Sequence, residues 1–155
     1  MNRVEPVFIQ NYTLPDLERW VESIGERRFR ARQVFRNIYG RHISGWGECS
    51  DLSKMFRLQL EYGAHLHAIA LRESTEAADG TRKFLFELRD GLCIESVLIP
   101  DPPRHTLCLS SQVGCALGCK FCLTGTLGLR RNLTTAEIVD QVCRVHEEVG
   151  ASRRI

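Results

Sequence analysis

Three cysteines within eight residues constrain this chain more than any other feature. Cys115, Cys119 and Cys122 follow a C-x3-C-x2-C spacing, which is too tight for the three sulfurs to come from separate elements. All three must therefore lie on one loop. Gly114 and Gly118 allow that loop the positive φ angles that a tight wrap around a ligand needs. Closely gathered thiolates repel one another unless a soft cation holds them, so the spacing predicts a metal site.

Two kinds of metal centre fit such a loop. A [4Fe–4S] cluster usually takes four cysteines, so three would leave one iron open to a small molecule, and we favour this interpretation. Zinc would need a fourth ligand, which Cys108, His105 or Cys143 could supply. Zinc ribbons hold their ligands on two hairpin knuckles, however, and no second knuckle is evident in this sequence. Three unconnected buried thiols are the remaining alternative.

The residues that flank the triad resemble a known family. Ser110-Ser111-Gln112-Val113-Gly114 precedes it, and Leu123-Thr124-Gly125-Thr126 and Gly128-Leu129-Arg130-Arg131-Asn132-Leu133-Thr134 follow it. The block resembles the radical S-adenosylmethionine superfamily and, within it, the RlmN type of RNA methyltransferase. The resemblance implies a [4Fe–4S] cluster on Cys115, Cys119 and Cys122, with S-adenosylmethionine chelating the open iron. It also assigns Phe121 to a cofactor-binding position that is usually aromatic, with simple core packing as the alternative.

The resemblance implies methylation of carbon 2 of adenine. This carbon is electron-poor, so direct methyl transfer from a sulfonium fails there. The family instead methylates a cysteine near its C-terminus, generates a radical on that methyl group, and adds it to the ring. Cys108 matches the second cysteine, which releases the product by forming a disulfide bond, and Glu95 matches the glutamate that accepts the proton from carbon 2. Without the resemblance, Cys108 would be a buried strand thiol and Glu95 an edge carboxylate in solvent.

Substrates and partners follow from the same resemblance. It implies 23S rRNA and tRNA as substrates, an electron donor such as flavodoxin, no membrane contact and a monomeric enzyme. One alternative is a sister enzyme of the Cfr type, which methylates carbon 8 of the same ribosomal adenosine. Another is a non-catalytic RNA-binding module stapled by zinc.

The length of the chain limits what it is expected to do. The methyl-carrying cysteine and the Gly-Glu-Pro-type segment of the family are absent from these 155 residues. We therefore expect the N-terminal part of a longer enzyme, able at most to assemble a labile cluster and unable to turn over.

Composition indicates a globular protein of the cytoplasm. Hydrophobic residues make up 43% and charged residues 26%, and the formal charge is only +2. Any affinity for nucleic acid must therefore come from local patches. The N-terminus lacks the apolar segment of a signal peptide, and no run approaches transmembrane length. Seven cysteines, an odd number that includes a clustered triad, fit a reducing compartment better than secreted disulfides.

Residues 27–41 contain six arginines and no acidic residue. Arg32 and Arg36 lie one turn apart on a predicted helix over 32–39, away from its apolar side. Such a density suits phosphate contacts, although a solvated helix face is the commoner meaning of a charge run. Beside the methyltransferase motif, we expect RNA contacts from Arg28, Arg30, Arg32 and Arg36.

We expect an α/β chain in three parts. Residues 1–65 are predicted to form a helical RNA-binding accessory domain. Residues 66–103 are predicted to form an antiparallel β meander and a linker. Residues 104–155 would then begin a radical-SAM (β/α) barrel that remains incomplete, with a strand over 106–110 as its first strand. Helices are predicted over 14–24, capped by Thr13, and over 51–62, capped by Ser50 with Met55 inward.

The later elements are predicted from turn and capping residues. Asp90-Gly91 indicates a two-residue hairpin, Asp79-Gly80 an earlier turn, and Asp101-Pro102-Pro103 a stiff linker. Thr134 and Glu137 form a capping box, which opens a helix that runs to about Val149. Its inward stripe is predicted to be Ile138, Val142, Val145 and Val149, and the remaining thiols, Cys49, Cys93 and Cys143, are predicted to be core residues.

Overall fold

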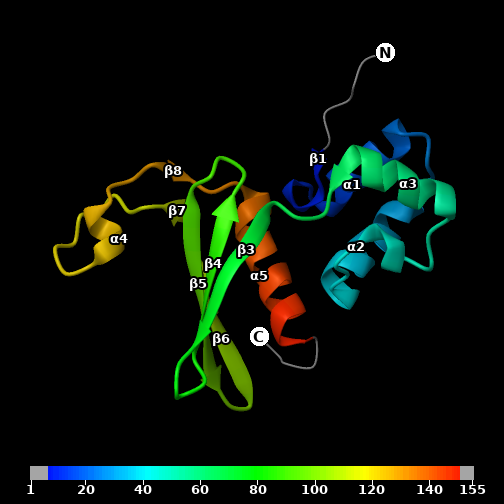
Figure 1. Cartoon of the computed structure of the whole chain (residues 1–155). Coiled ribbons are helices and arrows are strands. Elements are labelled where there is room, and N and C mark those ends of the chain that lie inside the picture. The colour runs from blue at the N-terminus through cyan, green and yellow to red at the C-terminus, as the bar shows by residue number, and fades with distance from the viewer. Residues whose placement is uncertain (1–6, 151–155) are drawn as a thin grey trace.

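The computed structural model describes residues 7–150, which form a helical part beside a twisted antiparallel sheet (Figure 1). The long helix α5 (Thr135–Val149) packs on the sheet, on the side that faces the helical part. The loop that carries the short helix α4 (Leu123–Thr126) projects from the sheet away from the helical part. The cysteine triad therefore lies at the opposite end of the molecule from the N-terminal helices.

The helical part contains α1 (Leu14–Ser23), α2 (Phe29–Arg41) and α3 (Lys54–Gly63). The 3-10 turn η1 (Ile9–Asn11) precedes α1, and a second, η2 (Trp46–Glu48), lies between α2 and α3. Strand β1 (Val7–Phe8) pairs in parallel with β2 (Ala64–His65). Thr13 caps α1 as predicted.

The predicted start of α3 is wrong by three residues. Ser53 caps this helix in place of Ser50, because its hydroxyl accepts the Phe56 N–H at 3.2 Å. Met55 consequently faces outward, with 69% of its surface exposed.

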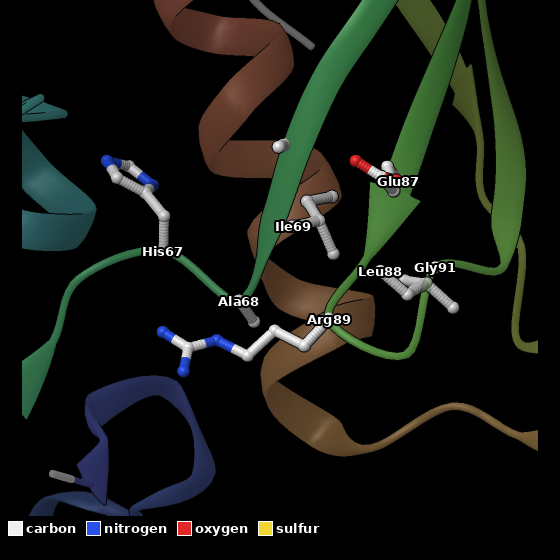
Figure 2. A pocket seen from close by; sticks show the side chains of 8 residues that line it. His67, Ala68, Ile69, Glu87, Leu88, Arg89 and Gly91 are labelled. Atoms are coloured by element: carbon white, nitrogen blue, oxygen red, sulfur yellow. The ribbon is translucent and has the colours of Figure 1, made fainter.

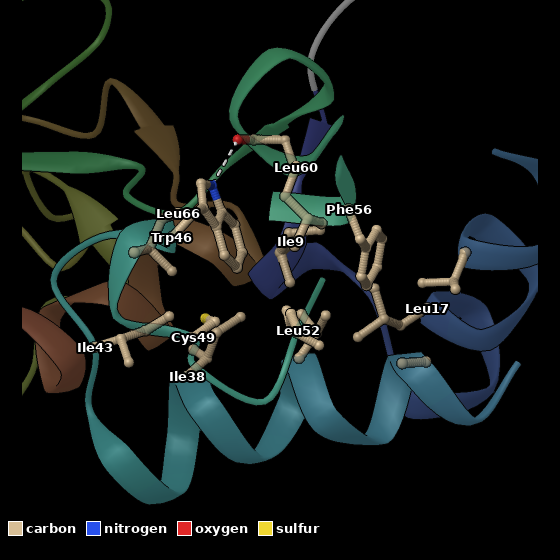
Figure 3. Close-up of a cluster of buried hydrophobic side chains, with 14 of the residues drawn as sticks. Ile9, Leu17, Ile38, Ile43, Trp46, Cys49, Leu52, Phe56, Leu60 and Leu66 are labelled. Atoms are coloured by element: carbon tan, nitrogen blue, oxygen red, sulfur yellow. Dashed lines mark hydrogen bonds between the residues drawn. The ribbon is translucent and has the colours of Figure 1, made fainter. Parts of the chain in front are cut away.

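Two hydrophobic cores hold the chain together. The first lies among the N-terminal helices (Figure 3) and includes Trp46 and Cys49, which confirms the prediction of Cys49 as a core residue. The second lies between the sheet and α5 and is centred on the fully buried Phe84 and Phe86. Helix α5 contributes to both, since Cys143 belongs to the first core and Val145 to the second.

The sheet has four antiparallel strands in the order β3-β4-β5-β6. These strands are β3 (Ile69–Glu76), β4 (Arg82–Leu88), β5 (Cys93–Asp101) and β6 (Arg104–Cys108). The Asp79-Gly80 turn is confirmed, with the Ala77 N–H donating to the Thr81 carbonyl at 2.8 Å.

The hairpin between β4 and β5 is one residue longer than predicted. The Leu88 N–H donates to the Leu92 carbonyl at 2.8 Å, so Arg89, Asp90 and Gly91 form a three-residue loop. Gly91 adopts a φ of 80°, as expected for a turn that ends in a left-handed residue. This extra residue fixes the register of β5, which pairs Leu85 with Glu95.

The predicted linker and first barrel strand are also different in the structure. Pro102-Pro103 forms the turn of a tight hairpin, because Asp101 pairs directly with Arg104. The strand that follows, β6, pairs antiparallel with β5 and continues the meander. Prolines suit this position because a turn does not need their missing N–H donors. The prediction of a separate linker is therefore wrong.

Helix α5 begins at the predicted capping box between Thr134 and Glu137. Its inward stripe is only partly right, because Val145 is fully buried but Ile138, Val142 and Val149 are only partly so. Asp140 and Gln141 are fully buried instead. Hydrophobic periodicity could not predict their burial, because a polar residue is buried only where the fold supplies hydrogen-bond partners for it.

Asp140 joins the helical part to the sheet. Its carboxylate accepts the Ala68 N–H at 2.7 Å and the Ile69 N–H at 3.1 Å, where the chain enters β3. The His67 Nδ1 atom lies 3.1 Å from the same carboxylate, and the Gln10 side chain donates to it at 3.4 Å. One carboxylate thus fixes the chain at the passage between the two cores.

Figure 2 shows the surface of this junction, where His67 and Arg89 lie at a hollow of about 360 Å³. Arg89 extends from the β4–β5 loop past Ala68, and its guanidinium carbon lies 4.6 Å from the centre of the Phe8 ring. The loop residue therefore adds a cation–π contact to the junction.

We expect His67 to titrate above the ordinary histidine range. Burial lowers the pKa of His67, but the hydrogen bond to Asp140 and the charges of Asp140 and Glu147 outweigh burial and the Arg144 charge, so the net pKa is raised. The stabilisation from protonated His67 is therefore complete below the ordinary pKa of about 6.5 and is lost as pH rises through the raised value. NMR titration of the His67 ring protons tests this, and Asp140→Asn should lower the midpoint. A midpoint at or below the ordinary value in the unmodified chain would contradict the assignment.

Candidate metal centre and neighbouring sheet face

The cysteine triad lies on a loop whose two ends are fastened together. Strand β7 (Gln112–Val113) pairs antiparallel with β8 (Arg131–Asn132), and the Arg130 N–H donates to the Val113 carbonyl at 2.9 Å. Arg131 also reaches Asp90 at 2.7 Å and Glu137 at 2.8 Å. The loop is therefore anchored to the β4–β5 turn and to the start of α5.

Glycines allow the two arms of the loop to approach closely. A Cβ atom on Gly114 would lie 1.8 Å from the Gly128 carbonyl oxygen, and one on Gly125 would lie 2.9 Å from the Cys119 nitrogen. Gly114 and Gly118 both have positive φ, at 74° and 61°, as the sequence predicted. Side chains at Gly114 and Gly125 would open the loop, so these positions require glycine.

Cys115, Cys119 and Cys122 are free, half-exposed thiols on this one loop. The Leu117 N–H points to the Cys115 sulfur at 3.4 Å, a donor of the kind that stabilises a thiolate. Within residues 7–150, no three His, Cys, Asp or Glu side chains are already gathered around one point. The donor set fits an iron–sulfur cluster in residue type and accessibility, and the three sulfurs must come closer together to bind one.

The loop also presents apolar side chains outward. Leu117 is 82% exposed, Phe121 94% and Leu123 80%. Phe121 is therefore not a core residue within the described residues 7–150. Clusters of exposed apolar side chains are rare on monomeric soluble proteins and indicate a surface that contacts another protein segment or a ligand.

Glu95 and Cys108 lie on the same outward face of the sheet. Along β5, Ile94, Ser96 and Leu98 are buried, so Glu95 and Val97 point away from α5. Cys108 is directly opposite Val97 and shares its face. Residues opposite or diagonal on one face are within about 4.5–8 Å of each other, so the structure brings Glu95 and Cys108 together. The alternative of Cys108 as a buried thiol is wrong, because it is exposed.

A hollow of about 410 Å³ separates this face from the triad loop. Glu95, Cys93 and Ser110 line its sheet side, while Gly114 and Leu127 line its loop side. The prediction of Cys93 as a core residue is therefore wrong. Glu95 also forms an ion pair with Lys83 at 3.0 Å. Lys83 was not predicted, because it is a diagonal neighbour of Glu95 only in the observed register, which pairs Lys83 with Val97 and Leu85 with Glu95.

The two buried thiols, Cys49 and Cys143, do not complete a zinc site with the triad. Cys49 and Cys143 are buried, and burial raises the pKa of Cys49 to about 11 and of Cys143 to about 12. Cys143 lies on α5, in the first hydrophobic core. All seven cysteines are free thiols, so the predicted disulfide bond has no partner for Cys108 among the described residues.

The predicted RNA-binding arginines are partly neutralised by acidic residues from other segments. Arg28 and Arg32 form ion pairs with Glu18, at 2.6 and 3.3 Å, and Arg36 pairs with Asp51 at 3.0 Å. Arg30 donates to the Asp51 carbonyl at 3.3 Å. The side chains of Arg28, Arg32 and Arg36 remain largely exposed, so a ligand can still reach them, whereas Arg30 is only partly exposed.

Comparisons with known proteins identify the family of the chain. Residues 8–66 match the family model described as the ribosomal RNA large subunit methyltransferase N-terminal domain. The dual-specificity RNA methyltransferase RlmN of Syntrophobacter fumaroxidans is 63% identical over 98% of this chain and 44% of its own length. RlmN of Geotalea uraniireducens is 51% identical over 94% of this chain and 42% of its own length. The chain belongs to the RlmN family.

A solved structure supports the same family at the level of the fold. The crystal structure of a radical SAM methyltransferase from Sphaerobacter thermophilus matches with a TM-score of 0.91 and 38% identity, over 97% of this chain and 45% of that one. The chain thus spans less than half the length of the RlmN relatives it matches, at their N-terminal domain. Within residues 7–150, no helix is both long and apolar enough to cross a membrane.

Proposed function

We propose that this chain forms the N-terminal part of a radical S-adenosylmethionine enzyme that methylates carbon 2 of adenosine in 23S rRNA and tRNA. The observation that carries the proposal is that Glu95 shares a sheet face with Cys108 and lines a hollow whose other side is the triad loop. A cytoplasmic monomer supplied with electrons by a donor such as flavodoxin is part of the same proposal.

Cys115, Cys119 and Cys122 would hold the [4Fe–4S] cluster, with Phe121 beside the bound S-adenosylmethionine. When bound, these cofactors supply the radical that ordinary side chains cannot provide. The exposed apolar residues of the loop would be covered by the rest of the barrel, which is proposed to begin after β6.

Glu95 would accept the proton that leaves carbon 2 of adenine. It is well placed for this role, because its carboxylate is open to a substrate on the sheet face and Lys83 holds it at 3.0 Å. Cys108 would release the methylated product as a thiol nucleophile, and its exposure on the same face supports the role. Arg28, Arg30, Arg32 and Arg36 would help the accessory domain, residues 1–65, to grip RNA.

A fusion protein tests this proposal. Residues 1–155 would be joined to the part of Syntrophobacter fumaroxidans RlmN that lies beyond the matched region. We expect the fusion to produce 2-methyladenosine in 23S rRNA and tRNA, dependent on S-adenosylmethionine and reductant. Glu95→Gln keeps the side-chain shape but removes the base, so we expect methylation to fall by about 100-fold or more. Mass mapping of the RNA provides the measurement.

The matched control is Glu76→Gln, a surface carboxylate at the end of β3, which should leave methylation unchanged. Methylation at carbon 8 would identify the sister activity instead. A fusion that holds its cluster but methylates no RNA would overturn the proposal.

A further inference from the structure

The β5–β6 ladder ends just where the proposed catalytic residues begin. Its last pair is Val97 with Cys108, so Glu95 and Ser96 continue along β5 without a β6 partner. Beyond Cys108 the chain leaves the sheet and runs through Ser110 toward the triad loop. The hydrogen bonds that normally hold two strands in register are therefore missing at this point.

Side chains replace the missing ladder. The Ser110 hydroxyl donates to the Glu95 carbonyl at 2.7 Å. Gln141 of α5 accepts the Ser96 hydroxyl at 2.7 Å and the Ser110 N–H at 2.9 Å through its amide oxygen. Its amide nitrogen donates to the Ser110 carbonyl at 2.9 Å and to the Glu137 carbonyl at 3.1 Å. Gln141 thus binds both the β5 segment and the departing chain.

Every hydrogen-bonding position of the Gln141 amide is used. The oxygen accepts two bonds and the nitrogen donates two, which is the capacity of both its hydrogens and both its lone pairs. The side chain is fully buried, and so is Ser96. A buried amide with four satisfied bonds has one available orientation, so it fixes its partners rigidly.

We infer that Gln141 is a positioning residue that holds Glu95 and the Cys108–Ser110 segment in the relative placement that adenosine methylation needs. This inference rests on the proposed function, because it assigns Gln141 to the same site. The side chain of Gln141 bonds to Ser96, Ser110 and Glu137 and to none of the triad cysteines, so it acts through the backbone of Ser110 and the hydroxyl of Ser96. An apolar residue would fill the same space but would release the Ser110 peptide group.

The test compares Gln141→Leu with a matched control in the same fusion protein. Gln10→Leu is the control, because Gln10 is also a buried glutamine, but its amide donates to the Leu66 carbonyl and to Asp140 and has no bond to Ser96 or Ser110. Three quantities are measured: iron content, 5′-deoxyadenosine formed by cleavage of S-adenosylmethionine, and methylated adenosine. We expect Gln141→Leu to lower the methylated adenosine formed per 5′-deoxyadenosine by about 10- to 100-fold, since a displacement of about 1 Å can cost that much. Iron content should stay within about twofold.

A second readout does not depend on activity. Hydrogen exchange at the Ser110 N–H of the 155-residue chain should be at least about tenfold faster in Gln141→Leu, and unchanged in Gln10→Leu. Gln141→Glu keeps the accepting oxygen but places a second acceptor against the Ser110 and Glu137 carbonyl oxygens, so it should not restore the Ser110 protection. Should Gln141→Leu fail to fold, Ser96→Ala replaces it, because this change removes only one of the four bonds.

The outcomes separate the two proposals. Equal coupling of cleavage to methylation in Gln141→Leu and Gln10→Leu, with equal Ser110 exchange, would overturn the role of Gln141. A loss of cleavage and methylation in parallel would also overturn it, since this would indicate general unfolding. If the unmodified fusion methylates no RNA, the proposed function fails. Faster Ser110 exchange in Gln141→Leu would then show only that Gln141 holds the Ser110 peptide group, and the inferred link between Gln141 and methylation would be overturned.

Discussion

Replacing Cys115, Cys119 or Cys122 with alanine is expected to abolish iron–sulfur cluster assembly in the 155-residue chain. The unmodified chain, reconstituted without oxygen, should hold about four irons and four sulfides. Each substitution removes one of the three soft donors that the loop offers. The buried thiols Cys49 and Cys143 cannot replace it, because burial raises their pKa values and both lie in the first hydrophobic core. Iron and sulfide analysis, with electron paramagnetic resonance of the reduced sample, measures the loss.

Cys108→Ala is the matched control for this prediction. Cys108 is also an exposed thiol, but it lies on β6 and outside the loop, so the cluster should remain. Under the zinc alternative Cys108 is a candidate fourth ligand, and its loss would release the metal. A measurement of one zinc per chain without sulfide, with the zinc lost in Cys108→Ala, would therefore favour a structural zinc site over the iron–sulfur cluster. An unchanged iron content after all three triad substitutions would refute the metal centre altogether.

Replacing Asp140 with alanine is expected to destabilise the fold by about 3–5 kcal/mol. The substitution leaves the Ala68 and Ile69 N–H groups without their acceptor in a buried place, and it removes the partner of His67. A buried donor left without a partner lowers the free energy of unfolding by the full cost of its desolvation. Unfolding in urea measures the effect, as a lower midpoint with an unchanged slope.

Asp140→Asn should cost less, because its amide oxygen can still accept one of the two backbone N–H groups. Glu76→Ala is the surface control: Glu76 is 63% exposed in its ion pair with Arg82, so its loss should shift the midpoint little. A midpoint for Asp140→Ala equal to that of Glu76→Ala would show that Asp140 does not secure the junction between the two cores.

Residue patterns along the chain predicted those helix starts that depend on neighbouring residues. The helix starting after Thr13 and the capping box at Thr134 were correct, because each cap involves residues three positions apart. The error at Ser50 has the same origin: two serines precede α3, and only the capped Phe56 N–H shows that Ser53 is the correct one. Hairpin length was less certain from sequence, because Asp90-Gly91 suits both two-residue and three-residue turns.

The additional residue in the β4–β5 loop decides on which face Glu95 lies relative to β4. A two-residue turn would have paired Glu95 with Phe86, which is buried, whereas the observed register pairs it with Leu85. Since side chains alternate along a strand, a shift of one residue moves every side chain to the other face. The neighbourhood of Glu95, Cys108 and Lys83 therefore depends on a turn that the sequence left ambiguous.

The sequence by itself determined the triad, its glycine-rich loop and the family to which the chain belongs, because these depend on spacing along the chain. Only the tertiary structure decided that Asp140 and Gln141 are buried, and that β6 extends the meander. Asp140 acts on residues more than seventy positions away, and Gln141 on a serine 45 positions away. Such partners meet only when α5 packs on the sheet, since a polar residue is stable in a core only where folding brings its hydrogen-bond partners to it.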